Sequence, residues 1–136
     1  MKVKLKEGAY EVLHAHSDDA GYELRTPVDC IVPANGSATI DTGVCMAIPN
    51  GYGGLLVSKS GLNVKFGLTG TGLIDSGYTD SIVVKLYNDT PNNYEFKAGD
   101  KVIQIVLIKI ATPDIEYVSE LDETDRGSDG FGSSGC

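Results

Sequence analysis

The stretch "TGLIDSGYTDSIVVKL", at 71–86, places an acidic residue and an aromatic residue around a turn between two apolar segments. Asp75 follows the apolar residues Leu73 and Ile74, and Tyr78 lies at the tip of the turn. This pattern predicts a β-hairpin. Apolar surroundings would remove water from the carboxylate and raise the pKa of Asp75, which suits a general base. The alternative is an aspartate that only closes the turn by accepting hydrogen bonds from nearby backbone N–H groups.

A second polar residue, Gln104, interrupts the apolar stretch "KVIQIVLIKI" at 101–110. In an extended strand, alternation puts Gln104 on one face with Val102, Val106, Ile108 and Ile110. A buried amide without partners costs about 1–3 kcal/mol, so Gln104 needs hydrogen bonds. From alternation alone, bonding to a neighbouring backbone group is favoured, and bracing a polar loop or touching a ligand is the alternative.

The other chemical candidates are weaker. "HAHSDD", at 14–19, places His14 and His16 on one strand face before two carboxylates, a metal-site hypothesis without a third clear ligand. The sequence lacks G-x-S-x-G, the nucleophile pattern of a Ser–His–Asp hydrolase. It also lacks GxxxxGK[ST], and GxGxxG in a strand–helix context, which excludes P-loop and Rossmann nucleotide binding.

These residues must be positioned by β-strands, because helix signals are nearly absent. Segments rich in Val, Ile and Tyr recur at roughly 8 to 12 residue spacing, which predicts an all-β sandwich or barrel. One short helical turn is expected at 60–65. The expected strands are "YEVLH", "DCIVP", "SATIDTG", "VCMAIPNG", "GGLLVS", "TGLID", "DSIVVKLYND", "YEFKAGD", "KVIQIVLIKI" and "IEYVS".

The chain has 136 residues, enough for one domain with a buried core. We expect an ordered domain over 1–121 and a flexible C-terminal arm over 122–136, which is acidic and then rich in Gly and Ser. The arm ends in "DRGSDGFGSSGC", which carries one guanidinium, Arg126, and one ring, Phe131. It is either a solvated end or a flap that folds over a planar anion.

The net charge of −8 argues against a nucleic-acid or anionic-membrane partner, either of which would require a basic stripe. No apolar run approaches the ~20 residues of a membrane span, and no signal-peptide pattern is visible, so we expect a cytoplasmic setting. Cys30, Cys45 and Cys136 lack metal-type spacing and are expected to be free thiols. An anionic ligand would need local cations or a metal.

Five Gly-flanked polar segments resemble, in order, the five motifs of the trimeric dUTP pyrophosphatases (dUTPases). They are "AGYEL" (20–24), "SKSGL" (58–62), "GLIDSGYTDSI" (72–82), "GDKVIQI" (99–105) and "RGSDGFGSSG" (126–135). The resemblance implies a distorted β jelly-roll subunit, a homotrimer with sites at subunit interfaces, and Mg²⁺-assisted hydrolysis of dUTP to dUMP and pyrophosphate. That activity limits uracil incorporation into DNA and supplies dUMP for thymidylate synthesis.

The resemblance also implies roles for the hairpin. Asp75 would deprotonate a water that attacks the α-phosphorus, and Tyr78 would pack under the deoxyribose, where a 2′-hydroxyl would clash. Main-chain groups would read the uracil edge; they are carried over to Thr69, Gly72, Leu73, Ile74 and Val83.

Three further groups are implied. Lys59, Ser60 and Gly61 would bind the triphosphate. Gln104 matches the fourth motif and would brace that loop or touch a phosphate, which reverses the preference drawn from alternation. Mg²⁺ would be held mainly by substrate phosphates, with Glu23 acting through water. In the arm, Phe131 would stack on uracil beside the closely approaching backbone of Gly132, and Arg126, Ser133 and Ser134 would grip the γ-phosphate.

The sequence departs from the family pattern at several positions. This chain has Glu23 where the family usually has Asp, Lys59 where it has Arg, Asp80 and Asp129 where it has Gly, and Ser134 where it has Thr. These changes bear on affinity more than on the reaction, because the base, the sugar-stacking Tyr and the arm's Arg and Phe are kept. The rival hypotheses are a dCTP deaminase of similar fold, a non-catalytic regulator or ligand-binding jelly roll, and a purely structural β-sandwich.

Overall fold

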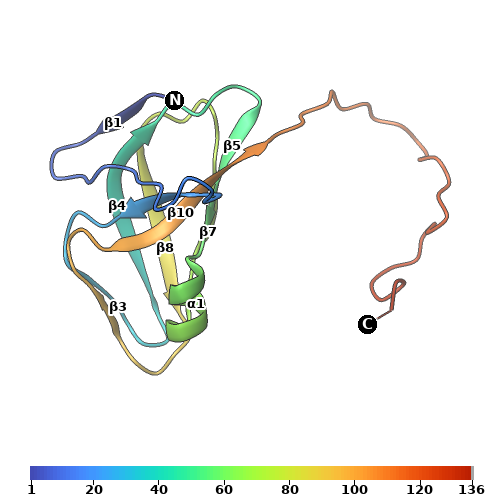
Figure 1. Cartoon of the computed structure of the whole chain (residues 1–136). Helices are drawn as coiled ribbons and strands as arrows, with labels where there is room; N and C mark the ends of the chain where they lie inside the picture. The colour runs from blue at the N-terminus through green and yellow to red at the C-terminus, as the bar shows by residue number, and fades with distance from the viewer. Residues whose placement is uncertain (136) are drawn as a thin grey trace.

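Two four-stranded antiparallel sheets form the body of the protein in the computed structural model, which describes residues 1–135 (Figure 1). One sheet has the order β1-β4-β8-β6 and the other β2-β10-β5-β7, and a two-stranded ribbon joins β3 to β9. The elements are β1 (Val3–Leu5), β2 (Tyr22–Arg25), β3 (Cys30–Val32), β4 (Ser37–Met46), β5 (Tyr52–Val57), α1 (Ser60–Phe66), β6 (Leu68–Thr69), β7 (Thr71–Ile74), β8 (Ser81–Asn88), β9 (Tyr94–Phe96) and β10 (Lys101–Lys109). The predicted all-β jelly-roll architecture is confirmed.

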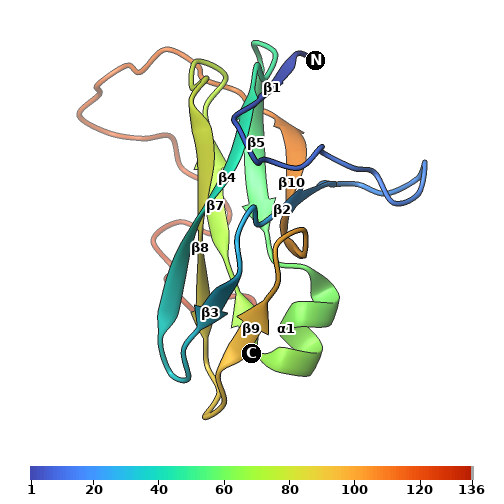
Figure 2. The same ribbon diagram turned by 90° about the vertical axis from the view of Figure 1, so that its left-hand side faces the viewer.

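The core lies between the sheets and is built by alternation. Along β8, Ile82, Val84 and Leu86 are buried, whereas Val83 and Tyr87 between them are exposed. Figure 2 shows the ribbon of β3 and β9 at the same end of the body as α1, and Tyr94 of β9 contacts Phe66 of α1 there. The other core side chains are Leu24, Val32, Ile40, Val44, Met46, Ile48, Leu56, Leu68, Phe96, Val102, Ile103 and Ile105.

The predicted face of β10 is wrong for Val102, which is buried and does not share the face of Gln104, and the burial expected for Gln104 is wrong as well. A register shift against β2 between Lys101 and Ile103 reverses the alternation, so Ile103 and Ile105 are fully buried. Gln104 therefore lies on the opposite, half-exposed face of the strand. A β-bulge of this kind cannot be seen in an uninterrupted apolar run.

The predicted hairpin at 71–86 is wrong as a pair of hydrogen-bonded strands. β7 pairs with β5 in one sheet, and β8 pairs with β4 in the other. The preceding β6 does pair with β8, but the chain leaves it at Gly70, where an added Cβ would lie 2.8 Å from the Lys85 carbonyl oxygen. Over residues 71–74 and 81–86 of the described chain, the two arms are therefore splayed and not paired with each other.

Other strand predictions are also corrected. "YEVLH" contributes an isolated bridge between Leu13 and Glu23, and "IEYVS" forms no strand, because no described segment runs beside it as a partner. "SATIDTG" and "VCMAIPNG" meet in one strand, β4. The expected helical turn is α1. The last strand ends at Lys109, and from Ile110 to Gly135 the chain continues without helix or strand as a C-terminal extension (Figure 1). The division into a domain over 1–121 and an arm over 122–136 stays a prediction.

Within the described residues, no helix is long and apolar enough to span a membrane. Cys30 and Cys45 are free thiols, as expected, and burial raises the pKa of Cys30. Cys136, predicted to be a third free thiol, lies outside the described residues.

Candidate active site

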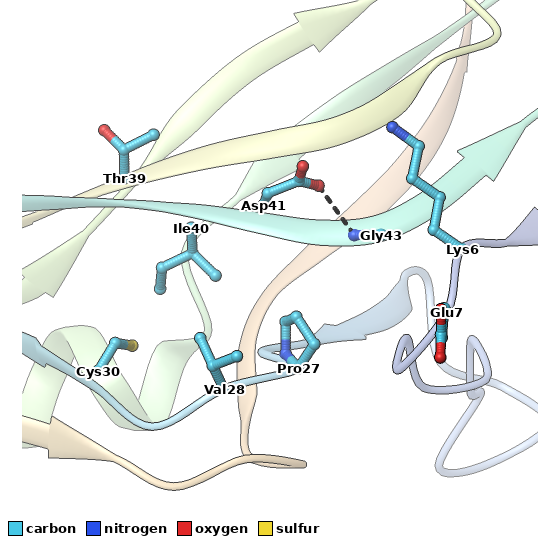
Figure 3. Close-up of a pocket in the computed structure, with 9 residues that line it drawn as sticks. All are labelled: Lys6, Glu7, Pro27, Val28, Cys30, Thr39, Ile40, Asp41 and Gly43. Atoms are coloured by element: carbon cyan, nitrogen blue, oxygen red, sulfur yellow. Dashed lines mark hydrogen bonds between the residues drawn. The ribbon is translucent and has the colours of Figure 1, made fainter.

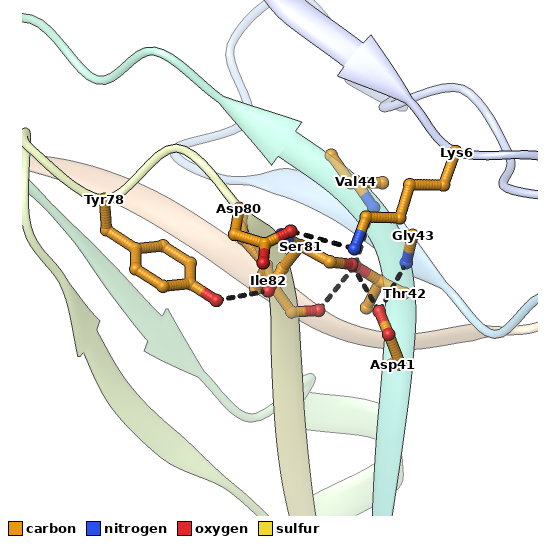
Figure 4. Close-up of polar contacts among 9 residues, drawn as sticks. All are labelled: Lys6, Asp41, Thr42, Gly43, Val44, Tyr78, Asp80, Ser81 and Ile82. Carbon is orange, nitrogen blue, oxygen red and sulfur yellow. Dashed lines mark hydrogen bonds and ion pairs between the residues drawn. The ribbon is translucent and has the colours of Figure 1, made fainter.

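Asp75 and Tyr78 lie on the turn between the two splayed arms. The Asp75 main-chain oxygen accepts a hydrogen bond from the Tyr78 N–H at 3.0 Å, which closes the turn. The Tyr78 hydroxyl donates to the Ser81 main-chain oxygen at 2.7 Å (Figure 4). The expected burial of Asp75 is wrong for the single chain, because its side chain is exposed. Its carboxylate is therefore open to a water or a ligand.

The splayed arms leave backbone edges that a planar ligand can use. β7 is the last strand of its sheet, so its edge away from β5 carries main-chain N–H and C=O groups with no strand opposite them in residues 1–135. On the other arm, β8 meets β6 only at Asn88 and Tyr87. Gly72 packs tightly, since an added Cβ would lie 3.2 Å from Leu56. Thr69 ends β6, and Leu73, Ile74 and Val83 lie along the two arms.

The segment Lys59–Gly61 begins α1 at the far end of β5. Lys59 is the N-cap residue, and the structure gives the helix start no side-chain cap. The first backbone N–H groups of a helix have no acceptor within it, so they are free to bind an anion. An added Cβ at Gly61 would meet nothing within 4 Å, which shows that the loop is open to a ligand.

Glu23 holds the Lys59 loop through an ion pair. Its carboxylate pairs with the ammonium groups of both Lys59 and Lys101, and the Glu23 side chain is only 10% exposed. Burial acts to raise the pKa of Glu23, but Lys101 and Lys59 outweigh it and hold that pKa below its usual value. Lys101 was missed from the sequence, although it lies inside the fourth motif.

Gln104 braces the same loop from the side. Its amide nitrogen donates to the Ser58 main-chain oxygen at 3.4 Å, one residue before Lys59. On its other side Gly21 leaves room for the amide, since a Cβ there would lie 2.8 Å from the Gln104 Oε1. The structure thus brings Glu23, Gln104 and the Lys59 loop together.

The Lys59 loop and Asp75 are not brought together within one chain. The Ser58 hydroxyl bonds the Gly70 backbone at 2.9 and 3.1 Å, so Lys59 lies beside the start of β7. Asp75 lies beyond the other end of β7, after Ile74, which pairs with Gly54. Five residues of extended chain from Gly70 to Asp75 span about 17 Å.

The arm forms a third separate group. The Arg126 guanidinium donates to the main-chain oxygens of Asp129 and Gly130 at 3.0 and 2.8 Å. Phe131 is fully exposed, and the residues beside it, Gly132, Ser133 and Ser134, lie in a turn. Arg126 and Phe131 therefore contact neither Asp75 nor the Lys59 loop in this chain.

The structure offers no cage for a metal ion made by protein alone. In the described part of the chain, no three His, Cys, Asp or Glu side chains gather as ligands. His14 stacks on Tyr22 with ring centroids 4.3 Å apart, so the metal hypothesis for His14 and His16 gains no third ligand. The Glu23 carboxylate is already paired with two ammonium groups. A cation here must take most of its ligands from a bound polyphosphate and water.

Two hollows lie near these groups. One, of about 220 Å³, is lined by Asp75 and Ser76 together with Ile110 and Thr112, where the chain leaves the body after β10. The other, of about 320 Å³, lies beside β4 between Lys6, Asp41 and Cys30, and none of the predicted site residues lines it (Figure 3). The first hollow therefore puts the segment that leads to the arm next to the Asp75 carboxylate.

Comparison with known proteins decides the family. The sequence profile of the dUTPase family matches residues 10–135. The chain belongs to the dUTPase family. It is 40% identical over 133 residues to the deoxyuridine 5′-triphosphate nucleotidohydrolase of Paramecium bursaria Chlorella virus 1, covering 97% of this chain and 94% of the relative. It is 41% identical to the enzyme of the same name from Arabidopsis thaliana, covering 97% of this chain and 80% of that one.

Solved dUTPase structures share the whole fold. The dUTPase of Staphylococcus bacteriophage 80alpha with dUPNHPP superposes with a TM-score of 0.93 at 30% identity, covering 99% of this chain and 98% of that one. A mutant dUTPase from phage phi11 of S. aureus, described as showing the coordination of a structural Mg(II) ion, has a TM-score of 0.81 at 29% identity, covering 88% and 96%. The predicted dUTPase resemblance is confirmed.

Proposed function

We propose that this chain is a dUTP diphosphatase that hydrolyses dUTP to dUMP and pyrophosphate, with Asp75 as the general base. The observation that carries the proposal is the placement of an exposed carboxylate and an aromatic ring, Asp75 and Tyr78, between two unpaired backbone edges. Asp75 takes a proton from a water whose oxygen bonds to the α-phosphorus. The bond from the α-phosphorus to the bridging oxygen then breaks, and pyrophosphate leaves.

The splayed arms supply selectivity for the base and the sugar. Backbone groups along Thr69, Gly72, Leu73, Ile74 and Val83 offer donors and acceptors to the edge of uracil. Cytosine presents the opposite hydrogen-bonding pattern, and the slot leaves no room for the thymine methyl group. The Tyr78 ring packs under the deoxyribose and fills the space that a ribose 2′-hydroxyl requires.

The triphosphate is bound by the Lys59, Ser60 and Gly61 loop of another copy of the chain. The loop is about 17 Å from Asp75 of its own chain, too far for both to act on one α-phosphorus. A site that joins two copies resolves this separation, and the homotrimer is the assembly we propose.

An apolar surface on the body supports association. The register of the β10-β5-β7 sheet sets Val106 opposite Leu55, and Leu55 opposite Leu73. Leu73 is 56% exposed, and Leu55 and Val106 are half-buried. An exposed apolar row of this kind is typical of a protein–protein interface. Between β10 and the arm, Ile115, Tyr117 and Leu121 are more than three-quarters exposed and need a partner as well.

Mg²⁺ fits the site as an ion held by the substrate. The absence of a three-ligand cluster in residues 1–135 is compatible with an ion that keeps its water shell and binds phosphate oxygens. When bound, Mg²⁺ neutralises charge on the polyphosphate. Lys59 supplies local positive charge within a chain of net charge −8, and Glu23 contributes through water at the edge of the loop.

The arm closes over the bound nucleotide of a neighbouring site. Phe131 stacks on uracil, with the backbone of Gly132 close to the base, and Arg126, Ser133 and Ser134 bind the γ-phosphate. To do so, the Arg126 guanidinium exchanges its bonds to Asp129 and Gly130 for phosphate oxygens. Closure therefore requires both a base and a terminal phosphate.

A nucleotide panel tests the proposal. Pyrophosphate release is measured with dUTP, dTTP, dCTP and UTP, with and without EDTA, and ammonia release is measured with dCTP. We expect dUTP to turn over far faster than the others, and EDTA to suppress the reaction. Ammonia from dCTP would support the deaminase alternative, and equal turnover of UTP would contradict the role of Tyr78.

A further inference from the structure

Strand β4 carries a bulge beside the active-site turn. Its pairing with β8 shifts register between Asp41 and Cys45, so residues 42–44 lie opposite the single residue Ile82, and the Thr42 hydroxyl donates to the Ile82 main-chain oxygen at 2.7 Å. Gly43 lies in the left-handed region at φ 70°, and an added Cβ would lie 2.7 Å from the Ala9 Cβ. Only glycine fits here. Bulges next to active sites commonly re-aim a side chain, and this one aims Asp41 at β8.

Asp41 meets the first residue of β8, Ser81. The Ser81 hydroxyl donates to the Asp41 carboxylate, which also accepts the Gly43 N–H at 2.9 Å (Figure 4). Ser81 is only 3% exposed, whereas Asp41 lies at the surface, so the carboxylate covers the buried serine from the solvent side. The Ser81 hydroxyl and the Gly43 N–H hold the pKa of Asp41 below its usual value, which keeps Asp41 a carboxylate.

The same Ser81 holds Tyr78. Its main-chain oxygen accepts the Tyr78 hydroxyl at 2.7 Å, and its N–H donates to the Asp80 carboxylate at 2.7 Å. The Tyr78 side chain is 41% exposed, so packing alone holds the ring weakly. The orientation of the ring depends on the position of the Ser81 carbonyl, and that position depends on the bond from Ser81 to Asp41.

The hydrogen bonds that link Asp41, Ser81 and Tyr78 form a brace, and the N-terminal segment adds two further contacts to it. The Lys6 N–H donates to the Gly43 main-chain oxygen at 2.8 Å, and the Lys6 ammonium pairs with Asp80 at 2.8 Å. Lys6 therefore contacts both the bulge of β4, at Gly43, and the active-site turn, at Asp80. Both side chains of this outer ion pair are exposed, so we assign the positioning to the hydrogen bond between Asp41 and the buried Ser81.

We propose that Asp41 and Ser81 are positioning residues for Tyr78, and that through it they set the discrimination between deoxyribose and ribose nucleotides. The inference rests on the proposed function, in which the Tyr78 ring excludes the 2′-hydroxyl. Neither residue touches the substrate. Their effect is to restrict the ring to the one orientation in which it fills the 2′ space.

The test compares kcat/KM for dUTP and UTP in Asp41→Asn and Ser81→Ala. Loss of this part-buried hydrogen bond to a charged group should allow the ring to move, and the preference for dUTP should fall about tenfold in each variant. Ser81→Thr keeps the hydroxyl and should keep the preference. Thr26→Val is the matched control, because it removes a buried hydroxyl that bonds to the Val28 oxygen at 2.7 Å and to none of Asp41, Tyr78 and Ser81.

A readout without substrate separates this inference from the proposed function. Fluorotyrosine placed at position 78 reports the ring by ¹⁹F NMR in the nucleotide-free protein. Asp41→Asn and Ser81→Ala should shift and broaden this resonance, and Thr26→Val should not. A wild-type protein that ignores dUTP would contradict the proposed function and the role in sugar choice. If wild type hydrolyses dUTP but Asp41→Asn and Ser81→Ala leave the preference for dUTP unchanged, Asp41 and Ser81 are not positioning residues for Tyr78. An unchanged fluorotyrosine resonance in these variants would contradict that role as well.

Discussion

Lys59 and Asp75 lie at opposite ends of the β5–β7 strand pair, separated by the length of strand β7. Ser58, next to Lys59, bonds to Gly70 at one end, and Asp75 follows Ile74 at the other. With the roles proposed for them, the Lys59 loop and Asp75 of one chain therefore cannot serve the same nucleotide. The proposed catalytic unit is thus a pair of neighbouring copies, completed by an arm.

Replacing Asp75 tests the general base. Asp75→Asn should bind dUTP but lose about 10²–10⁴-fold in kcat, because the amide cannot take the proton from water. Steady-state turnover and nucleotide binding by calorimetry measure the two effects separately. Asp89→Asn, an exposed aspartate after β8, is the control and should be fully active. Full activity in Asp75→Asn would show that another group is the base.

Deleting residues 125–136 tests the arm as a lid. The truncated chain should keep its oligomeric state but lose most of its turnover, because Arg126 and Phe131 no longer close on the nucleotide. Light scattering gives the mass, and pyrophosphate release gives the rate. Normal hydrolysis of dUTP by the truncated protein would mean that the arm is only a solvated end.

The buried Glu23 pair predicts a pH-dependent stability. Its pKa lies below the ordinary 4.5 in the folded chain, so Glu23 stabilises the fold above that pH. The contribution is lost as pH falls from 4.5 through the folded pKa. Glu23→Gln should therefore lower the melting temperature at pH 7. The difference in melting temperature between this variant and wild type should become smaller as the pH falls below 4.5.

Thermal melts from pH 3 to 7 measure this effect, with the exposed Glu95→Gln as the control. A constant difference between Glu23→Gln and wild type across this range would show that the two lysines do not depend on the charge of Glu23.

The sequence predicts the parts of this fold that are governed by local pattern. Alternation holds along β8, the strand expected at "DSIVVKLYND", where Ile82 and Val84 are buried and Val83 is exposed. It fails on β10, where the register shift after Lys101 reverses the faces. "IEYVS" has strand composition but no partner among the described residues, and a strand requires one.

The site was predictable where motif residues act through local geometry, and not where it depends on distant contacts. Asp75 and Tyr78 share one turn, so their relation follows from their spacing. Asp41 and Ser81 are 40 residues apart and meet only because the bulge at Gly43 turns one strand toward the other. The Glu23 pair with Lys101 likewise depends on the register of β2 against β10.

The composite site is the central claim, and mixed oligomers test it most directly. Asp75→Asn and Lys59→Met are each expected to be strongly impaired. After the two are unfolded together and reassembled, random trimers should regain about a quarter of wild-type activity, because that share of sites joins an intact Asp75 to an intact Lys59. Mixing Asp75→Asn with the double variant Asp75→Asn/Lys59→Met is the matched control and should recover none. A mixture that contains mixed trimers by mass spectrometry yet stays as inactive as its parents would contradict the composite site.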